Sequence, residues 1–293
     1  MRFRFDQFVL VCGIFAVVGN SASGQSLNSR LSQLTYTYVY GAGGDTHVGN
    51  DLIEDNLLVE SDIEHTDFSG STAGVLPGDP ERPYTAGVSI DLDHEYTIVG
   101  PYSSFRSIIA SGTTDLTSSV SGFGSATTNS SSPGNHLIFY FTVDHPVEYD
   151  LSGAVASTEP SFATAVALQR FDGFAWQYVF YSAFLPGSQG VFDASGVLSP
   201  GEYRILGSIG QNTFASESHS ASYNYTLTLT TEGDMNCDGR VDGLDVQGFV
   251  LALLDGAAYD AAYPECSALN GDMNDNGSVT LDDIPAFVTT LLP

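Results

Sequence analysis

The sequence predicts a mainly β protein, an antiparallel β-sandwich of jelly-roll-like type, followed by a small all-α calcium-binding module. Runs of alternating polar and apolar residues fill the middle of the chain, and turn signals separate them. An Asp/Asn/Gly-rich segment occurs twice near the C-terminus. We therefore expect a signal peptide over residues 1–24, a β-sandwich over 30–231 and the calcium-binding domain over 233–293.

The composition excludes one class of partner. The chain has 293 residues, of which 42% are hydrophobic and 12% aromatic, so a packed core is expected. Its formal net charge is −27, from 35 acidic and 8 basic residues, and every basic residue is arginine. Such a charge repels phosphate backbones and attracts divalent cations. We therefore expect no nucleic-acid partner.

The N-terminus resembles an export signal. Two arginines lie within residues 1–5, an apolar run follows over 8–18, and small residues fill 19–24. This order predicts cleavage near Gly24 and a secreted protein, either extracellular or associated with the cell surface. A membrane anchor is the alternative, but the apolar run is short for a bilayer span. We expect no membrane span after cleavage.

The cysteines predict one disulfide. Cys12 lies in the apolar run of the signal and would be removed with it. Cys237 and Cys266 remain, and secreted chains fold in an oxidising compartment. We expect these two residues to form a bridge.

The middle of the chain is typical of an antiparallel sandwich, with no long helical periodicity. A Thr/Ser-rich run over 127–132 is expected to be a loop or a seam between two halves. Turn signals occur at Pro133–Gly134, Asp172–Gly173, Pro186–Gly187 and Pro200–Gly201. The clearest strand patterns lie over 34–40, 136–143, 163–171, 175–181, 202–209 and 222–230.

One acidic cluster in the middle invites a chemical interpretation. On a strand, Asp91, Asp93 and Glu95 share one face. Adjacent carboxylates can bind a cation or raise the pKa of one member for acid–base chemistry. The alternative, which we favour, is a solvated strand face.

Four aromatic residues at alternate positions, Phe174, Trp176, Tyr178 and Phe180, are also predicted to share a face. We expect them to fill the sandwich core, as most aromatic side chains do. If they are exposed instead, they form a face able to stack on sugar rings.

Catalysis is left open by the sequence. No HExxH or GxSxG motif occurs, and the histidines are scattered singly. A glycosidase carboxylate pair comes from distant strands and leaves no local signature. We incline to a non-catalytic protein, and the catalytic residues of an enzyme, were it one, are unknown.

Two twelve-residue segments predict two Ca²⁺ sites. The first loop is residues 234–245 and the second loop is residues 272–283, and an apolar helix-like stretch follows each. Ca²⁺ takes six to eight oxygen ligands, and Gly239 or Gly277 at position 6 permits the sharp turn. The ligand positions hold Asp234, Asn236, Asp238, Arg240 (through its carbonyl), Asp242 and Asp245 in the first loop, and Asp272, Asn274, Asn276, Ser278 (carbonyl), Thr280 and Asp283 in the second.

This duplicated loop–helix pattern, with aspartate at position 12, resembles a type I dockerin. The resemblance implies a small domain that folds on Ca²⁺ and docks onto a cohesin-like module of a scaffold or cell-surface protein. Dockerin bearers are often polysaccharide-degrading enzymes. The family usually contacts its partner through hydroxyl residues late in the loop and basic residues on the helix. Here those places hold Gly243–Leu244, Leu281–Asp282, Val250–Leu251 and Val288–Thr289.

Together these features predict a secreted calcium-binding interaction protein whose dockerin-like module anchors a β-sandwich to a cohesin-type partner or an extracellular assembly. Two alternatives share the same module. One is a polysaccharide-degrading hydrolase or lyase, and the other is a carbohydrate-binding module, each with a polysaccharide as partner.

Overall fold

The computed structural model describes residues 25–42, 45–76, 79–100, 102, 105–129, 135–144, 146–158, 164–183, 189–238, 240–264, 266–274 and 276–292. The expected signal peptide with Cys12, the turn signals at 133–134 and 186–187, and Gly239 of the first loop lie outside the described residues.

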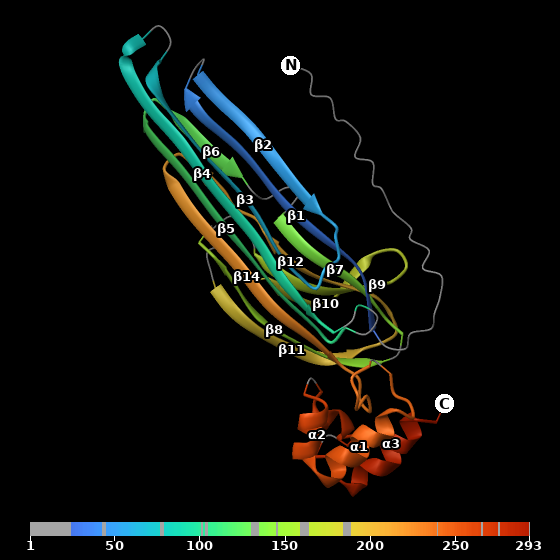
Figure 1. Ribbon diagram of the computed structural model, residues 1–293. Helices are drawn as coiled ribbons and strands as arrows, with labels where there is room; N and C mark the ends of the chain where they lie inside the picture. The colour runs from blue at the N-terminus through green and yellow to red at the C-terminus, as the bar shows by residue number, and fades with distance from the viewer. Residues whose placement is uncertain are drawn as a thin grey trace.

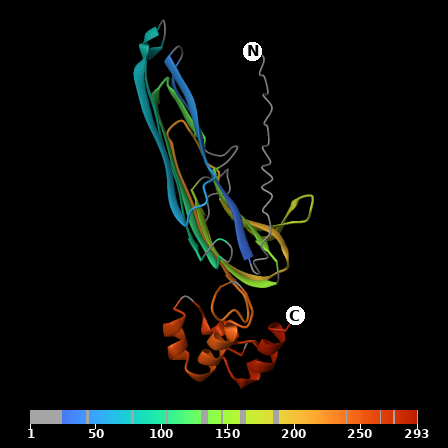
Figure 2. The same ribbon diagram turned by 45° about the vertical axis from the view of Figure 1, so that its right-hand side comes forward.

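The described residues form two antiparallel sheets that pack face to face, as Figures 1 and 2 show. The larger sheet has the order β10 (Trp176–Ala183), β9 (Ala165–Phe171), β12 (Gly201–Ile209), β7 (Asn135–Val143), β1 (Gln25–Ala42), β6 (Ser125–Asn129) and β13 (Asn212–Phe214), and β2 (Asp45–Asp55) pairs with β1. The smaller sheet has the order β11 (Gln189–Leu198), β8 (Val147–Ser157), β14 (Glu217–Thr230), β5 (Ser107–Gly122), β4 (Asp79–Val99) and β3 (Ser61–Leu76).

The strand pairing has the nested order of a jelly roll. β9 pairs with β10 and β7 with β12 in the larger sheet, whereas β8 pairs with β11 and β5 with β14 in the smaller sheet. These pairs are nested along the chain and are divided between the two sheets, and β6 also pairs with β13 in the larger sheet. This confirms the predicted mainly β, antiparallel sandwich.

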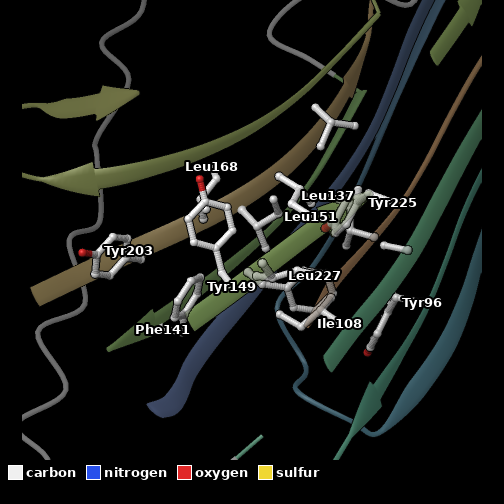
Figure 3. Close-up of a cluster of buried hydrophobic side chains, with 14 of the residues drawn as sticks. Tyr96, Ile108, Leu137, Phe141, Tyr149, Leu151, Leu168, Tyr203, Tyr225 and Leu227 are labelled. Atoms are coloured by element: carbon white, nitrogen blue, oxygen red, sulfur yellow. The ribbon is translucent and has the colours of Figure 1, made fainter. Parts of the chain in front are cut away.

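The main core lies between the two sheets in the half nearer the helices (Figure 1), and Figure 3 shows some of its side chains. Alternation along β7 buries Phe139 and Phe141 completely and leaves Tyr140 between them on the outer face, partly exposed. Figure 3 shows Phe141, Leu151 and Leu227 among the side chains that meet in this layer. Period-two burial is what the sequence pattern predicted for these strands.

A second part of the sandwich extends away from the main core, where β1 and β6 face β3, β4 and β5 (Figure 1). Its interior contains Leu34, Ile90 and stacked rings, of which Tyr38 and Phe68 have centroids 4.0 Å apart. The aromatic residues that alternate along β1 therefore serve packing here.

The Thr/Ser-rich run expected to be a loop is partly a strand, so that prediction was wrong for residues 127–129. These residues belong to β6, and residues 130–132 lie outside the described part of the chain. Thr128 is buried, and its hydroxyl lies 2.6 Å from that of Thr213 on β13. Threonine is β-branched and suits a strand, and burial of hydroxyl pairs is not visible in composition.

The helices of the described chain lie in the C-terminal part, at one end of the sandwich (Figures 1 and 2). Phe249 and Phe287 stack with centroids 4.0 Å apart and, with Met235 and Tyr259, form a small core of their own. The elements are α1 (Asp245–Leu254), α2 (Gly256–Ala262), the 3₁₀ turn η1 (Ala268–Gly271), the 3₁₀ turn η2 (Leu281–Asp283) and α3 (Ile284–Thr290).

Among the described residues, none of the helices has the length and apolar character needed to span a membrane.

Candidate functional site

The first loop is closed by the carboxylate of Asp245, the first residue of α1. This side chain is completely buried, and its Oδ1 accepts hydrogen bonds from the backbone N–H groups of Met235 (2.7 Å) and Asn236 (3.1 Å). Its Oδ2 accepts a hydrogen bond from the backbone N–H of Asp242 at 2.7 Å. One carboxylate therefore ties both ends of the loop to the start of the helix.

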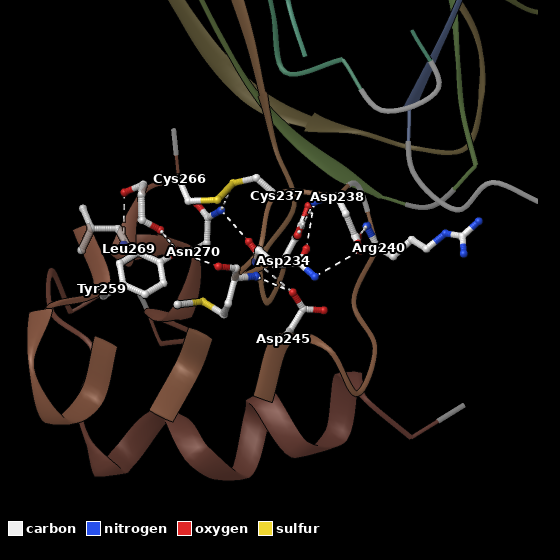
Figure 4. The surroundings of a disulfide bond; sticks show 12 residues. Asp234, Cys237, Asp238, Arg240, Asp245, Tyr259, Cys266, Leu269 and Asn270 are labelled. Carbon is white, nitrogen blue, oxygen red and sulfur yellow. Dashed lines mark hydrogen bonds between the residues drawn. A yellow bond between two sulfur atoms is a disulfide. The ribbon is translucent and has the colours of Figure 1, made fainter. Parts of the chain in front are cut away.

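Side-chain oxygens at alternate positions turn back onto the backbone of the first loop. The N–H of Asp238 donates to Oδ1 of Asn236 at 2.9 Å and to Oδ1 of Asp234 at 3.2 Å. Figure 4 shows the Arg240 side chain extending away from Asp234 and Asp245. Two further contacts are the N–H of Arg240 to Oδ1 of Asp238 at 3.0 Å and the N–H of Leu244 to Oδ1 of Asp242 at 2.8 Å.

The second loop repeats this arrangement. Asp272 is buried, and its two carboxylate oxygens accept the N–H groups of Asn276 (3.0 Å) and Gly277 (2.6 Å). Gly277 has φ of +88°, a conformation in which a side chain would be strained. Asn276 accepts from both the N–H and the hydroxyl of Ser278, and Asn274 is exposed. The glycine at position 6 thus makes the turn that the sequence predicted.

Asp283, at position 12 of the second loop, has one carboxylate oxygen without a partner. The side chain is completely buried, and its Oδ2 accepts the N–H (2.7 Å) and the hydroxyl (3.1 Å) of Thr280. Its Oδ1 is also buried and has no hydrogen-bond partner among the described residues. An unpaired buried carboxylate oxygen is costly, and a bound cation is one partner that can offset such a cost.

Asp245 and Asp283 therefore occupy equivalent places in the two halves of the repeat. Among the described residues, the donors to both carboxylates are neutral N–H or O–H groups. Burial raises the pKa of Asp245, and the backbone donors around it oppose that rise. Two buried carboxylates with only neutral donors leave negative charge that a metal ion can neutralise.

A disulfide joins Cys237 and Cys266, as the sequence predicted (Figure 4). It connects position 4 of the first loop to the segment between the loops. Asn270 of that segment donates from Nδ2 to the backbone oxygen of Asp234 at 2.8 Å. The inter-loop segment thus braces the first loop, a role that sequence reasoning did not assign to Asn270.

Two other groups of ligand atoms meet on the sandwich. Among the described residues, sets of three carboxylate or histidine ligand atoms within 4.8 Å of one another occur at His65–Asp91–Asp93 and at Asp55–Asp62–Glu64. The loop carboxylates form no such set in the described structure. Backbone N–H groups donate to Asp234, Asp245, Asp272 and Asp283 instead, and Oδ1 of Asp283 is left without a partner among the described residues.

The first of these groups lies on the outer face of the smaller sheet. His65 on β3 hydrogen-bonds Asp93 at 2.7 Å through Nδ1 and lies 3.5 Å from Asp91 on β4. The hydrogen bond to Asp93 and the nearby carboxylates raise the pKa of His65. Burial and the charges of Asp91 and Asp93 raise the pKa of Asp115 on β5. Asp91, Asp93 and Glu95 do share one face, and only the strand register brings His65 to it.

The second group is already neutralised by arginine. The side chain of Arg30 is completely buried and forms ion pairs with Glu64 and with Asp55, the latter at 2.8 Å. Its Nε donates to the carbonyl of Leu57 at 2.9 Å, and its guanidinium lies over the ring of Tyr96. These contacts indicate a structural ion-pair cluster in the sandwich.

The four aromatic residues predicted to fill the core do not do so together, and that expectation was wrong. Phe174 is 97% exposed in the turn before β10, and Tyr178 is 61% exposed. Phe180 alone packs against the main core, and Trp176 is partly exposed. A register shift between Tyr178 and Phe180 puts Phe180 on the opposite face from Tyr178, which a regular alternation cannot reveal.

Comparisons with known proteins assign no family. No protein-family model matches the chain, and no curated protein sequence matches it. A solved family 4 carbohydrate-binding module is 14% identical over 36% of this chain and 71% of its own, with a TM-score of 0.25. The carbohydrate-binding and catalytic modules of Clostridium thermocellum xylanase 10B, solved with xylohexaose, are 16% identical over 39% of this chain and 25% of theirs, with a TM-score of 0.23. The VP2 subviral particle of infectious bursal disease virus is 9% identical over 77% of this chain and 76% of its own, with a TM-score of 0.25. Likenesses this weak establish neither a family nor a function.

Proposed function

We propose that residues 233–293 form a calcium-dependent docking module of dockerin type, and that this module anchors an exported β-sandwich to a cohesin-type partner outside the cell. The observation that carries the proposal is the pair of buried aspartates at position 12 of the two loops. Asp283 in particular has a buried, unpartnered Oδ1.

The donor set of each loop suits Ca²⁺. The ligand positions supply oxygen from carboxylates, side-chain amides, a hydroxyl and backbone carbonyls, and Ca²⁺ prefers hard oxygen donors in a flexible ring. The N–H groups that donate to Asp234, Asp245 and Asp272 already hold these carboxylates in the loops. A bound Ca²⁺ would neutralise the clustered negative charge and take the unpaired oxygen of Asp283 as a ligand.

The surface for docking is a pair of equivalent apolar stripes. Val246, Val250 and Leu254 are exposed at successive turns of one face of α1. Ile284, Val288 and Leu292, thirty-eight positions later in each case, are exposed on and just after α3. The late loop positions that are polar in the resembling family hold exposed Leu244 and Leu281. The partner surface is therefore expected to be apolar.

Titration calorimetry on the full secreted chain, after treatment with a chelator, tests the metal. We expect two Ca²⁺ sites, with the first loop tighter because it offers four carboxylates and the second offers two. Asp283→Asn keeps the side-chain volume, removes the charge and should abolish the weaker site. Asp245→Asn should abolish the tighter site.

The matched control is Asp282→Asn, which neutralises an exposed neighbour outside the ligand positions and should leave both sites intact. A second arm measures binding to a panel of purified cohesin modules with Ca²⁺ and with chelator. Val250→Asp combined with Val288→Asp should abolish Ca²⁺-dependent docking, whereas Leu269→Asp, an exposed leucine outside the stripes, should not. Absence of Ca²⁺ binding by the unmodified chain would end the proposal.

A further inference from the structure

The outer face of the larger sheet, near its β10 edge, carries aromatic rings that the core does not use. Phe171, Gln169 and Ala167 alternate along β9 and therefore share one face. Their cross-strand partners on β10 are Trp176, Tyr178 and Tyr181 respectively. These three β10 residues therefore lie on that same face, which is opposite to the face that buries Leu168 in the core.

A β-bulge creates this arrangement. Tyr178 pairs with Gln169 and Phe180 pairs with Leu168, so the register shifts by one residue between them. Without the shift, Tyr178 and Tyr181 would point to opposite faces. With it, their ring centroids lie 4.7 Å apart, and Phe180 turns inward against Phe192, 5.2 Å away.

The rings on β10 are exposed to solvent, and Trp176 also packs against neighbouring side chains. Tyr178 is 61% exposed and Tyr181 is 48% exposed. Trp176 is partly exposed and packs against Phe171, with centroids 5.2 Å apart, while the guanidinium of Arg204 on β12 lies 4.5 Å from its ring centre. We call Phe171, Trp176, Tyr178 and Tyr181 the aromatic platform.

The platform continues into polar groups across the sheet. Tyr178, Gln169, Arg204 and Tyr140 are successive cross-strand partners on β10, β9, β12 and β7. Arg204 donates from Nε to Oε1 of Gln169 at 2.6 Å, and this bond holds its guanidinium over the ring of Trp176. The aromatic platform therefore has a hydrogen-bond donor, the guanidinium of Arg204, next to it on the same face of the sheet.

The outer face of the smaller sheet has a different composition. Its β4, β5 and β14 strands present small hydroxyl residues at neighbouring positions, such as Ser89, Thr117 and Ser218. Exposed aromatic side chains are thus clustered on the outer face of the larger sheet, whereas small hydroxyl residues occupy these positions on the smaller sheet. Such a cluster of exposed apolar rings indicates a binding surface.

We propose that the aromatic platform binds a neutral polysaccharide. The flat apolar face of a pyranose ring stacks on tyrosine and tryptophan, whose amphipathic rings suit a ligand that is apolar on its faces and hydroxylated at its edges. Arg204 lies where it can donate to those hydroxyls. The net charge of −27 repels acidic polysaccharides and nucleic acids, whose bases would otherwise stack on the same rings.

Affinity electrophoresis and calorimetry on the full chain test this site. The probes are soluble xylan, mixed-linkage β-glucan and galactomannan, with alginate and polygalacturonate as acidic comparators. We expect binding to at least one neutral polysaccharide and to neither acidic one. Tyr178→Ala and Tyr181→Ala should each weaken that binding roughly tenfold, since each removes one stacking ring.

Tyr178→Phe retains the ring and should bind within a factor of about two of the unmodified chain. Phe214→Ala removes an exposed ring from β13, at the opposite edge of the same sheet, and should leave binding unchanged. Binding should also persist in chelator, which separates this site from the calcium module. Failure of all three neutral probes, binding to the acidic polysaccharides alone, loss of binding in chelator, or unchanged binding by the Tyr178→Ala and Tyr181→Ala double variant would each overturn the proposal.

Discussion

At the scale of single residues, this protein buries ionisable side chains in two different ways. Arg30 enters the sandwich with two carboxylates and a carbonyl around it, so its charge is paired within the fold. Asp245 and Asp283 are equally buried but meet only neutral donors among the described residues. The first arrangement is complete within the chain, whereas the second is the one for which we propose a bound cation.

His94 is a further buried ionisable residue, and it gives a pH prediction. It lies on β4, hydrogen-bonds the hydroxyl of Ser32 at 2.9 Å, and is 1% exposed. Burial first, then the charges of His136 and Arg30, lowers its pKa from 6.5 to about 3. The folded state therefore holds His94 neutral at a pH where the unfolded chain takes up a proton.

The lowered pKa of His94 sets the direction in which stability changes with pH. Stability from His94 is fully present above pH 6.5 and decreases as the pH falls from there toward about 3, by up to ~1.4 kcal/mol per pH unit. Urea unfolding of the unmodified chain and of His94→Gln, at neutral and at mildly acidic pH, measures this. The unmodified chain should lose more stability than the variant between the two conditions, and an equal loss in both would contradict the prediction.

At the scale of elements, close approach between strands constrains the core as strongly as hydrophobicity does. Tyr223 on β14 is buried between the backbones of the two sheets. A Cβ added at Gly207 on β12 would lie 2.1 Å from its ring, and one added at Gly112 on β5 would lie 2.5 Å from it. The ring fits only because both neighbours are glycine.

Gly207→Ala should therefore destabilise the sandwich by about 1–3 kcal/mol, because the ring cannot move without disturbing a close-packed interior. Chemical unfolding followed by tryptophan fluorescence measures the change. Gly243→Ala is the control, since a Cβ there meets no atom within 4 Å. A stability for Gly207→Ala equal to that of the control would show that the interior tolerates the added methyl group.

The aromatic platform and the apolar stripes of α1 and α3 are likewise properties of elements. The platform depends on the bulge in β10, which places Tyr178 and Tyr181 on one face. The stripes depend on helical periodicity repeated in α1 and α3. The aromatic platform therefore arises where the two-residue period of a strand is interrupted, whereas the apolar stripes arise from an uninterrupted helical period.

At the scale of the whole molecule, the sandwich and the helical tail, residues 233–293, should respond differently to chelation. The tail has a small core around Met235, Phe249, Tyr259 and Phe287, and its loops concentrate carboxylates that repel one another without metal. The sandwich has a far larger core and requires no metal for it in our proposal.

Two spectroscopic signals separate these parts. The chain has one tryptophan, Trp176, which lies in the sandwich, whereas the described helices lie in the tail. Chelator should reduce the helical signal in far-UV circular dichroism and leave tryptophan emission unchanged, and added Ca²⁺ should restore the helical signal. The Asp245→Asn and Asp283→Asn double variant should resemble the chelated state even with Ca²⁺ present. A helical signal that is unchanged by chelator would contradict a metal-dependent tail.

Much of this organisation was determined by the sequence alone, where the relevant contacts are local. Strand patterns such as 136–143 and 202–209 carry their own period of two and became β7 and β12. The Gly277 turn, the helices after Asp245 and Asp283, and the Cys237–Cys266 bridge were predicted because each depends on short spacing or on a choice between few partners.

The tertiary structure decided the features that depend on register between distant strands. Only the pairing of β3 with β4 brings His65 beside Asp91 and Asp93, and only the bulge against β9 places Tyr181 beside Tyr178. The unpartnered oxygen of Asp283 likewise emerges from packing. Side-chain periodicity fixes which residues share a strand face, but pairing across many residues fixes which faces meet, and a shift of one residue reverses them.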